Sequence, residues 1–168
     1  EKYISWFMKS KISNIYFIGI GGIGMSAIAR YFKACDYNVA GYDCTRSEVC
    51  TNLEEEGIQV HYDDNLNLIG SYYKDKDTTL VIYTPAIPSD HHELTFFREN
   101  GFEVIKRSEA LGRLCEKKKC LAVAGTHGKT SISTITSCIM ARTKDKCSAF
   151  LGGISKNYGT NYILSESD

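Results

Sequence analysis

The sequence predicts an α/β fold: a Rossmann-like open parallel sheet with flanking helices, followed by the beginning of a P-loop-type ATP-binding α/β domain. Three observations support this prediction. Short apolar segments alternate with segments of helical periodicity. A glycine-rich turn at 19–24 follows the first apolar segment, and a second turn, at 125–130, follows a later one.

The first part of the chain has the pattern of a β-α-β-α-β unit, which builds open parallel sheets. Its first segment is apolar on both faces, as expected of a buried parallel strand. After the glycine turn, Met25, Ile28 and Phe32 recur at helical spacing. The expected elements are a strand at 14–20, a helix at 25–35, a strand at 38–42, a helix at 46–56 and a strand at 58–60.

The next part continues this alternation after a polar, irregular connection at 63–78. Both prolines of the chain fall in the segment 84–89, which is therefore expected to be a loop. Ser108 is a candidate N-cap for the last helix of this part. The expected elements are a strand at 79–83, a helix at 91–100, a strand at 102–105 and a helix ending at Leu114.

A charged break at 116–119 predicts a boundary between two domains, 1–116 and 117–168. The segment 120–124 is expected to be a buried strand that leads into the second turn, and a helix with Ile132, Ile135 and Ile139 on one face follows. Residues 117–168 are too few for a complete nucleotide-binding domain. We expect only the beginning of that domain, with an unfinished apolar face.

Composition excludes several classes of protein. Among 168 residues, 20 Lys and Arg balance 20 Asp and Glu, which argues against a general nucleic-acid binder. The longest apolar stretch, 15–25, is too short and too glycine-rich to cross a bilayer. The chain starts at Glu1 without the features of a secretory signal, and its natural N-terminus is expected further upstream. The seven cysteines form no C-x-x-C pair, which favours reduced thiols in a cytoplasmic protein.

The first turn has the pattern G-x-G-x-x-G between a strand and a helix. Glycines let the backbone approach an anion closely, and a helix N-terminus offers unpaired N–H groups and a partial positive charge. Asp43 ends the second strand, where it could accept a hydrogen bond from a ribose hydroxyl or cap the next helix. The alternative for the turn is tight strand–helix packing without a ligand.

The second turn is two residues shorter between its glycines than a standard P-loop. Its backbone would cradle phosphates, Lys129 would reach the β- and γ-phosphates, and the Thr130 hydroxyl would bind Mg²⁺, with Ser131 the less favoured ligand. His127 could contact a phosphate or be a solvated loop residue. A lysine placed at a helix start by chance is the alternative.

The two turns together indicate more than either alone. A dehydrogenase would use the first turn and leave Lys129 unexplained, whereas a simple P-loop NTPase would leave the preceding domain unexplained. A domain for a diphosphate-bearing substrate beside one for ATP suggests a ligase that uses ATP to activate a nucleotide-linked substrate.

Four motifs carry a resemblance to a known family. They are Gly-Ile-Gly-Gly-Ile-Gly-Met-Ser-Ala-Ile-Ala (19–29), Thr-Pro-Ala-Ile-Pro (84–88), Arg-Ser-Glu (107–109) and Ala-Gly-Thr-His-Gly-Lys-Thr (124–130). These four motifs, in the order in which they occur along the chain, resemble those of the Mur ligase family. The resemblance implies a three-domain enzyme whose first domain binds a UDP-sugar, whose central domain binds ATP and Mg²⁺, and whose last domain helps to bind an amino acid.

The resemblance also implies site residues. Lys129 and His127 would be catalytic, and Thr130 would be the magnesium ligand. The UDP-sugar site would comprise Gly19, Gly21, Gly22, Ile23, Gly24, Asp43, Thr84, Pro85, Ala86 and Arg107. The ATP site would comprise Gly125, Thr126, His127, Gly128, Lys129, Thr130 and Ser131.

Three further positions match the family less specifically. Arg107 could equally form a salt bridge, and His61 and Asn65 match a His…Asn pair without an assigned role. Glu166 is expected to be a solvated loop residue, with the family's magnesium-binding Glu-Ala-Asp-Glu segment beyond Asp168.

The implied reaction joins L-alanine to the lactyl carboxylate of UDP-N-acetylmuramate through an acyl phosphate, in the synthesis of peptidoglycan precursors. ATP and Mg²⁺ are the implied cofactors, UDP-N-acetylmuramate and L-alanine are the small-molecule substrates, and the chain alone is expected to be inactive. Three alternatives stay open: a ligase that attaches a tripeptide to the same sugar, an NAD-dependent oxidoreductase, and a non-catalytic binding module. The sequence carries no prediction of oligomeric state.

Overall fold

The computed structural model describes residues 11–116, 118–144 and 146–164. Strands and helices alternate through the first part of the chain, as the sequence predicted. The elements are β1 (Asn14–Ile18), α1 (Ile23–Ala34), β2 (Asn38–Tyr42), α2 (Glu48–Glu55), β3 (Gln59–His61), the 3-10 helix η2 (Ser71–Lys74), β4 (Thr79–Tyr83), α3 (His92–Glu99), β5 (Glu103–Lys106), α4 (Arg107–Cys115), α5 (Lys129–Met140), β6 (Ala149–Ser155) and β7 (Thr160–Ile163).

The first five strands form one parallel sheet in the order β3-β2-β1-β4-β5. β1 lies in the middle and is buried along its whole length, with Ile15 opposite Val39 of β2 on one side and Leu80 of β4 on the other. This arrangement confirms the predicted open parallel sheet. The chain leaves β1 toward β2 and later returns to the other side of β1 as β4, so the carboxyl ends of β1 and β4 border the topological switch point, where such sheets bind ligands.

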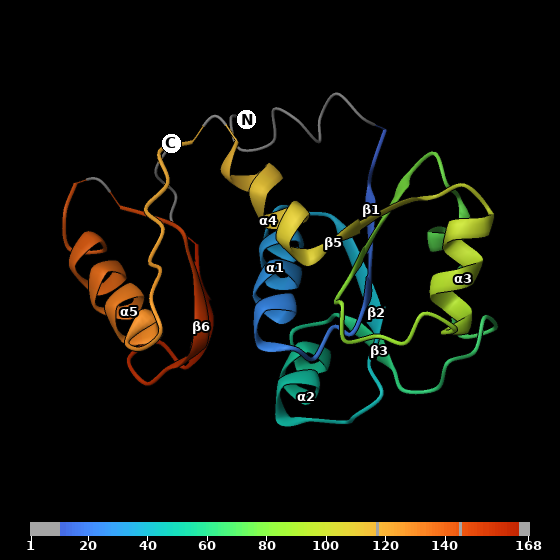
Figure 1. Cartoon of the computed structure of the whole chain (residues 1–168), viewed down its shortest axis with the longest axis horizontal. Helices are drawn as coiled ribbons and strands as arrows, with labels where there is room; N and C mark the ends of the chain where they lie inside the picture. Colours follow the sequence, from blue (N-terminus) through green and yellow to red (C-terminus); the bar gives the residue numbers. More distant parts are fainter. Residues whose placement is uncertain (1–10, 117, 145, 165–168) are drawn as a thin grey trace.

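Helices cover both faces of the sheet (Figure 1). α1, α2 and α4 lie on one face, around a core that includes Phe17, Ile28 and Leu53. α3 and η2 lie on the other face, where Tyr16 and Phe97 are buried. The side chains of β1 therefore belong alternately to two separate cores, because successive residues of a strand point to opposite faces.

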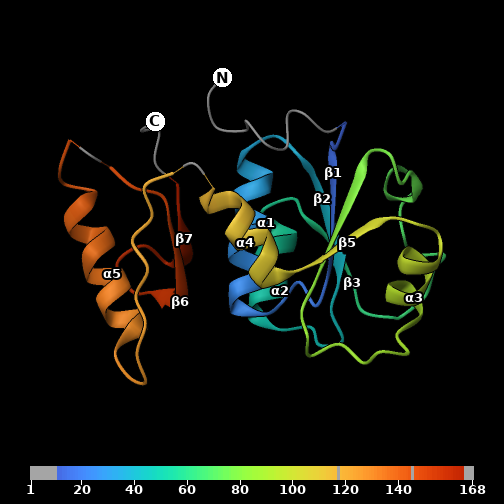
Figure 2. The same ribbon diagram turned by 45° about the horizontal axis from the view of Figure 1, so that its top comes forward.

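An antiparallel hairpin of β6 and β7 packs on the side of α1 that faces away from the sheet. Phe150 and Tyr162 both contact the ring of Tyr31 on α1, with centroids 5.6 and 6.2 Å apart. α5 lies on the opposite side of the hairpin (Figure 2). Neither strand of this hairpin was predicted from the sequence.

Two predictions about local structure are wrong. Residues 120–124 form no strand, and Leu121 is 75% exposed. No strand of the described residues pairs with this segment, and a strand without neighbours leaves its backbone groups unsatisfied. Ser108 does not cap a helix, because α4 begins one residue earlier and its N-cap is Lys106.

The helix α5 confirms the prediction of an unfinished apolar face. Ile132, Ile135 and Ile139 are 52%, 59% and 58% exposed. Residue 117, where the predicted second domain begins, and Glu166 lie outside the described residues.

Candidate functional site

The glycine turn begins where β1 ends and is fixed to both neighbouring strands. The N–H groups of Gly19 and Ile20 donate to the carbonyl oxygen of Tyr42, at 2.8 and 3.0 Å. Gly19 has φ +87°, and a Cβ there would lie 2.5 Å from the Cγ2 atom of Thr84, which follows β4. Both the left-handed backbone and the contact with Thr84 require glycine at this position.

Asp43 holds the middle of the turn. Its Oδ2 atom accepts a hydrogen bond from the Gly21 N–H at 2.8 Å, and its Oδ1 atom accepts one from the Thr45 N–H at 3.0 Å. The N-cap of α2 is instead Ser47, so Asp43 is not a helix cap. Asp43 thus accepts the hydrogen bond of one N–H group of the turn. A contact between Asp43 and a ribose stays a prediction.

The last two residues of the glycine turn, Ile23 and Gly24, are also the first two residues of α1, and their N–H groups are free among the described residues. The N–H groups of Met25 and Ser26 both donate to the Gly22 carbonyl oxygen. In the part of the chain that the structure describes, the N–H groups of Ile23 and Gly24 have no acceptor. No acidic side chain lies in this first turn. Unpaired N–H groups and the positive end of the helix dipole together favour an anion here.

Arg107 adds a full positive charge to this helix end. A Cβ on Gly24 would lie 2.8 Å from the Nη1 atom of Arg107 and 3.3 Å from its Cζ atom, so the guanidinium lies against the first turn of α1. None of the ion pairs among the described residues includes Arg107. The salt-bridge alternative therefore finds no support.

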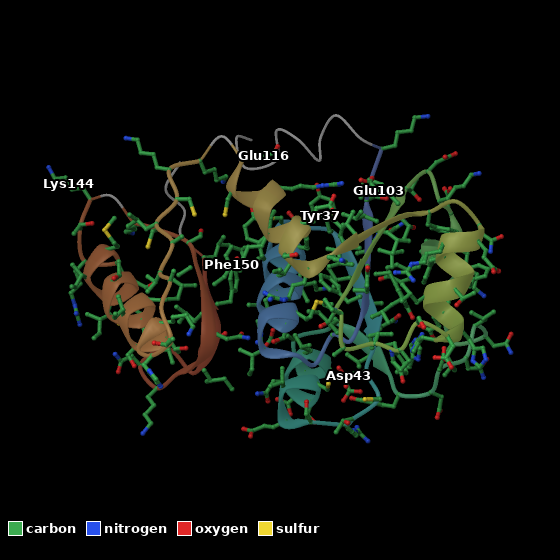
Figure 3. The ribbon with its side chains drawn as sticks, viewed as in Figure 1. Tyr37, Asp43, Glu103, Glu116, Lys144 and Phe150 are labelled. Carbon is green, nitrogen blue, oxygen red and sulfur yellow. The ribbon has the colours of Figure 1, made fainter. Side chains whose placement is uncertain are left out.

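The loop after β4 completes the edge of the site. The N–H of Thr84 donates to the Ile18 carbonyl oxygen at 3.2 Å, and the N–H of Ile87 donates to Thr84 to form a turn. Pro85 and Ala86 are exposed in this loop. Figure 3 shows Asp43 at the same edge of the sheet, where β1 and β2 end. The structure therefore brings together the glycine turn, Asp43, Thr84 and Arg107, and their binding of a UDP-sugar stays a prediction.

His61 and Asn65 have structural partners. The His61 Nε2 atom lies 2.7 Å from the Tyr16 hydroxyl and 3.2 Å from the Oε1 atom of Glu93, and burial lowers the pKa of His61. The Asn65 Oδ1 atom accepts from the N–H of Asn67 at 3.0 Å.

Glu93 is a buried carboxyl group that the sequence did not predict. Its side chain is fully buried, its Oε2 atom accepts from the Tyr16 hydroxyl at 2.8 Å, and burial raises its pKa to about 7. A glutamate in the first turn of an amphipathic helix is common, so nothing in the sequence distinguishes this one.

The second turn is exposed at residues 125–131. Gly128 has φ +79° and is the N-cap of α5, without a side-chain cap. The Lys129 ammonium donates to the carbonyl oxygens of Gly125 and Thr126, at 2.5 and 3.0 Å. A Cβ on Gly152 of β6 would lie 2.9 Å from the Thr130 Oγ1 atom. The lysine and the helix start lie together as predicted, but no strand precedes them.

Two features are absent from residues 11–116, 118–144 and 146–164. Within them, no group of three or more His, Cys, Asp or Glu side chains could hold a metal ion. The same residues contain no helix of the length and apolar character that a membrane span needs.

A parallel sheet with a glycine turn and an uncapped helix N-terminus near its switch point places this chain among the open-sheet α/β proteins. The sequence model of the Mur ligase family, catalytic domain, matches residues 14–119. The chain belongs to the Mur ligase family.

Two curated relatives carry the same name, UDP-N-acetylmuramate–L-alanine ligase. The one from Phocaeicola vulgatus is 54% identical over 156 residues, which cover 93% of this chain and 34% of the relative. The one from Porphyromonas gingivalis is 52% identical over 155 residues, 92% of this chain and 34% of the relative. This chain thus spans about a third of the length of these relatives.

Solved structures agree with the fold. UDP-N-acetylmuramate-alanine ligase from Thermotoga maritima is 31% identical, with a TM-score of 0.77 over 89% of this chain and 34% of that one. UDP-N-acetylmuramate:L-alanyl-gamma-D-glutamyl-meso-diaminopimelate ligase from Neisseria meningitides is 23% identical, with a TM-score of 0.82 over 93% of this chain and 48% of that one. The second likeness shows the fold alone.

Proposed function

We propose that this chain is the UDP-sugar-binding part, together with the beginning of the ATP-binding domain, of an ATP-dependent ligase. The ligase would join L-alanine to the lactyl carboxylate of UDP-N-acetylmuramate, in the synthesis of peptidoglycan precursors. Relatives that share about half of the residues of this chain carry this activity in their names. We expect the reaction in the cytoplasm, because ATP is its co-substrate.

One observation carries the proposal. The Gly24 N–H has no acceptor among the described residues. The Arg107 guanidinium packs against the side of Gly24, where a Cβ would lie 2.8 Å from its Nη1 atom, and none of the ion pairs among the described residues includes it. Both groups lie near the switch point of the sheet, where Gly19 meets Thr84. A diphosphate carries two negative charges, which an arginine and a helix N-terminus are suited to bind.

The exposed second turn suits a triphosphate. Gly128 begins α5 without a side-chain cap, so the first N–H groups of the helix are available to phosphate oxygens. Lys129 would leave the carbonyl oxygens of Gly125 and Thr126 and contact a phosphate. The Thr130 hydroxyl is our candidate ligand for Mg²⁺, and His127 is a candidate phosphate contact. Mg²⁺ would neutralise charge on the transferred phosphoryl group.

In this proposal, two segments of the chain bind two different substrates. Residues 1–116 would bind the UDP-sugar, and 117–168 would supply the first part of the ATP site. Phosphoryl transfer to the lactyl carboxylate gives an acyl phosphate, which the amine of L-alanine attacks with release of phosphate. The residues of this chain would position the sugar and stabilise negative charge, and we assign no covalent step to them.

Calorimetric titration of the chain tests the proposal. We expect binding of UDP-N-acetylmuramate and no binding of NADH, whereas binding of NADH alone would favour the oxidoreductase. Arg107→Gln should weaken binding about 10- to 100-fold through loss of a charge-assisted hydrogen bond. Arg98→Gln is the matched control, because Arg98 lies on α3, on the opposite face of the sheet, over the ring of Tyr83. In a protein of the relatives' full length that contains this chain, a product assay with L-alanine against tripeptide separates the two ligases.

A further inference from the structure

Asn161 on β7 is a polar residue with no exposed surface. Its Nδ2 atom donates to the carbonyl oxygen of Ile23 at 2.5 Å and to the Oγ atom of Ser26 at 2.9 Å. Its Oδ1 atom accepts from the Nη1 atom of Arg30 at 2.6 Å. All three partners belong to α1, so this amide joins the hairpin to the helix that begins at the glycine turn.

The hydrogen bond to Ile23 acts on the candidate site directly. The Ile23 carbonyl and the Gly24 N–H belong to the same peptide unit, which is planar and trans. Their directions are therefore opposite and fixed to each other. The Ser26 hydroxyl also donates to the Ile23 oxygen, at 3.0 Å, so Asn161 contacts both this oxygen and the hydroxyl that shares it. The groups that hold the Ile23 oxygen also set the direction of the Gly24 N–H, which has no acceptor among the described residues.

The hairpin is anchored well enough to hold this amide in place. Phe150 of β6 projects toward α1 in Figure 3, and its ring and that of Tyr162 pack on Tyr31. Arg30, which donates to Asn161, is itself held by an ion pair with Glu56 at 2.7 Å. The orientation of the Asn161 amide is thus determined on both of its sides, as positioning requires.

We propose that Asn161 is a positioning residue for the diphosphate of the UDP-sugar. It orients the Gly24 N–H through the Ile23 carbonyl, so the hairpin that follows α5 completes a site whose other residues lie between Gly19 and Arg107. This inference rests on the proposed function. One residue that determines UDP-sugar binding would then lie in the segment 117–168, which the sequence assigned to the ATP domain.

Asn161→Leu tests the proposal, because leucine is similar in size and removes both donors and the acceptor without adding charge. The matched control is Asn157→Leu, an exposed residue of the turn between β6 and β7. Two measurements are made on each chain: the ¹⁵N–¹H signal of Gly24 without ligand, and the affinity for UDP-N-acetylmuramate. We expect Asn161→Leu to shift the Gly24 signal and to weaken binding about tenfold, or about 1.4 kcal/mol. Asn157→Leu should change neither.

Thermal unfolding establishes that each variant is folded. If Asn161→Leu fails to fold, Asn161→Asp replaces it, because aspartate keeps the acceptor for Arg30 and loses the donors to Ile23 and Ser26. A folded variant with an unchanged Gly24 signal and unchanged affinity overturns the proposal. If the unaltered chain does not bind UDP-N-acetylmuramate, the proposed function is wrong. The Gly24 signal then still decides whether Asn161 orients this amide.

Discussion

Gly24→Ala should weaken ligand binding without weakening the fold. The new Cβ would lie 2.8 Å from the Nη1 atom of Arg107 and 3.3 Å from its Cδ and Cζ atoms. The guanidinium is the far end of a flexible side chain, which can move aside at small cost. The Gly24 N–H remains in the variant, so the substitution displaces Arg107 alone. Alanine also favours the helix over glycine by roughly 0.5–1 kcal/mol.

The magnitude follows from the lost contact. A hydrogen bond between charged groups is worth about 1.5–3 kcal/mol, so we expect the dissociation constant for UDP-N-acetylmuramate to rise about 10- to 100-fold. Calorimetry measures the affinity, and urea unfolding measures stability, which should stay equal or increase. The control is Gly112→Ala in α4, where a Cβ would meet nothing within 4 Å. This control should gain helix stability and bind normally.

Either of two binding results would show that Arg107 does not act as proposed. Unchanged affinity in Gly24→Ala would show that Arg107 does not contact the ligand from its present position. An equal loss of affinity in Gly112→Ala would show that the effect arises in α4 and not at the helix end.

Three further predictions concern the core, the buried carboxyl group and the second turn. Gly41→Ala should destabilise the chain by about 1–3 kcal/mol in urea unfolding, because its Cβ would lie 2.5 Å from the Phe17 carbonyl oxygen, and equal stability would contradict this. Burial raises the pKa of Glu93 from 4.5 to about 7, so the native state keeps a proton that the unfolded chain releases. The free energy of unfolding should therefore fall by up to ~3 kcal/mol as the pH rises between these values, and Glu93→Gln should remove this fall. If the unfolding free energy of the unaltered chain and of Glu93→Gln changes equally with pH, the prediction is wrong. In a protein of the relatives' full length that contains this chain, Lys129→Ala should abolish turnover and leave the affinity for the UDP-sugar nearly unchanged. Loss of both turnover and UDP-sugar affinity would contradict the assignment of Lys129 to the ATP site alone.

The sheet could be predicted because its strands carry their own signal. Each of β1 and β4 is a short apolar run, and a run buried on both faces indicates a parallel sheet covered by helices. The same signal failed at residues 120–124. An apolar composition shows that a segment can be a buried strand, but pairing depends on neighbours, which the described residues do not supply there.

The candidate site was predictable in part. The glycine pattern located the turn, because backbone conformation and close approach both demand glycine there. The bond from the Gly21 N–H to Asp43 was not predictable, because the sequence offered two other roles for that carboxylate. The contacts of Arg107 with Gly24, and of Asn161 with α1, join positions far apart in the chain. No local pattern records such a contact.

The first turn of α1 and Arg107 together are proposed to bind the diphosphate of the UDP-sugar. A crystal structure of the chain with UDP-N-acetylmuramate measures this most directly. We expect diphosphate oxygens within hydrogen-bonding distance of the Gly24 N–H and of the Arg107 guanidinium. A UDP-sugar bound elsewhere, with both of these groups facing solvent, would contradict it.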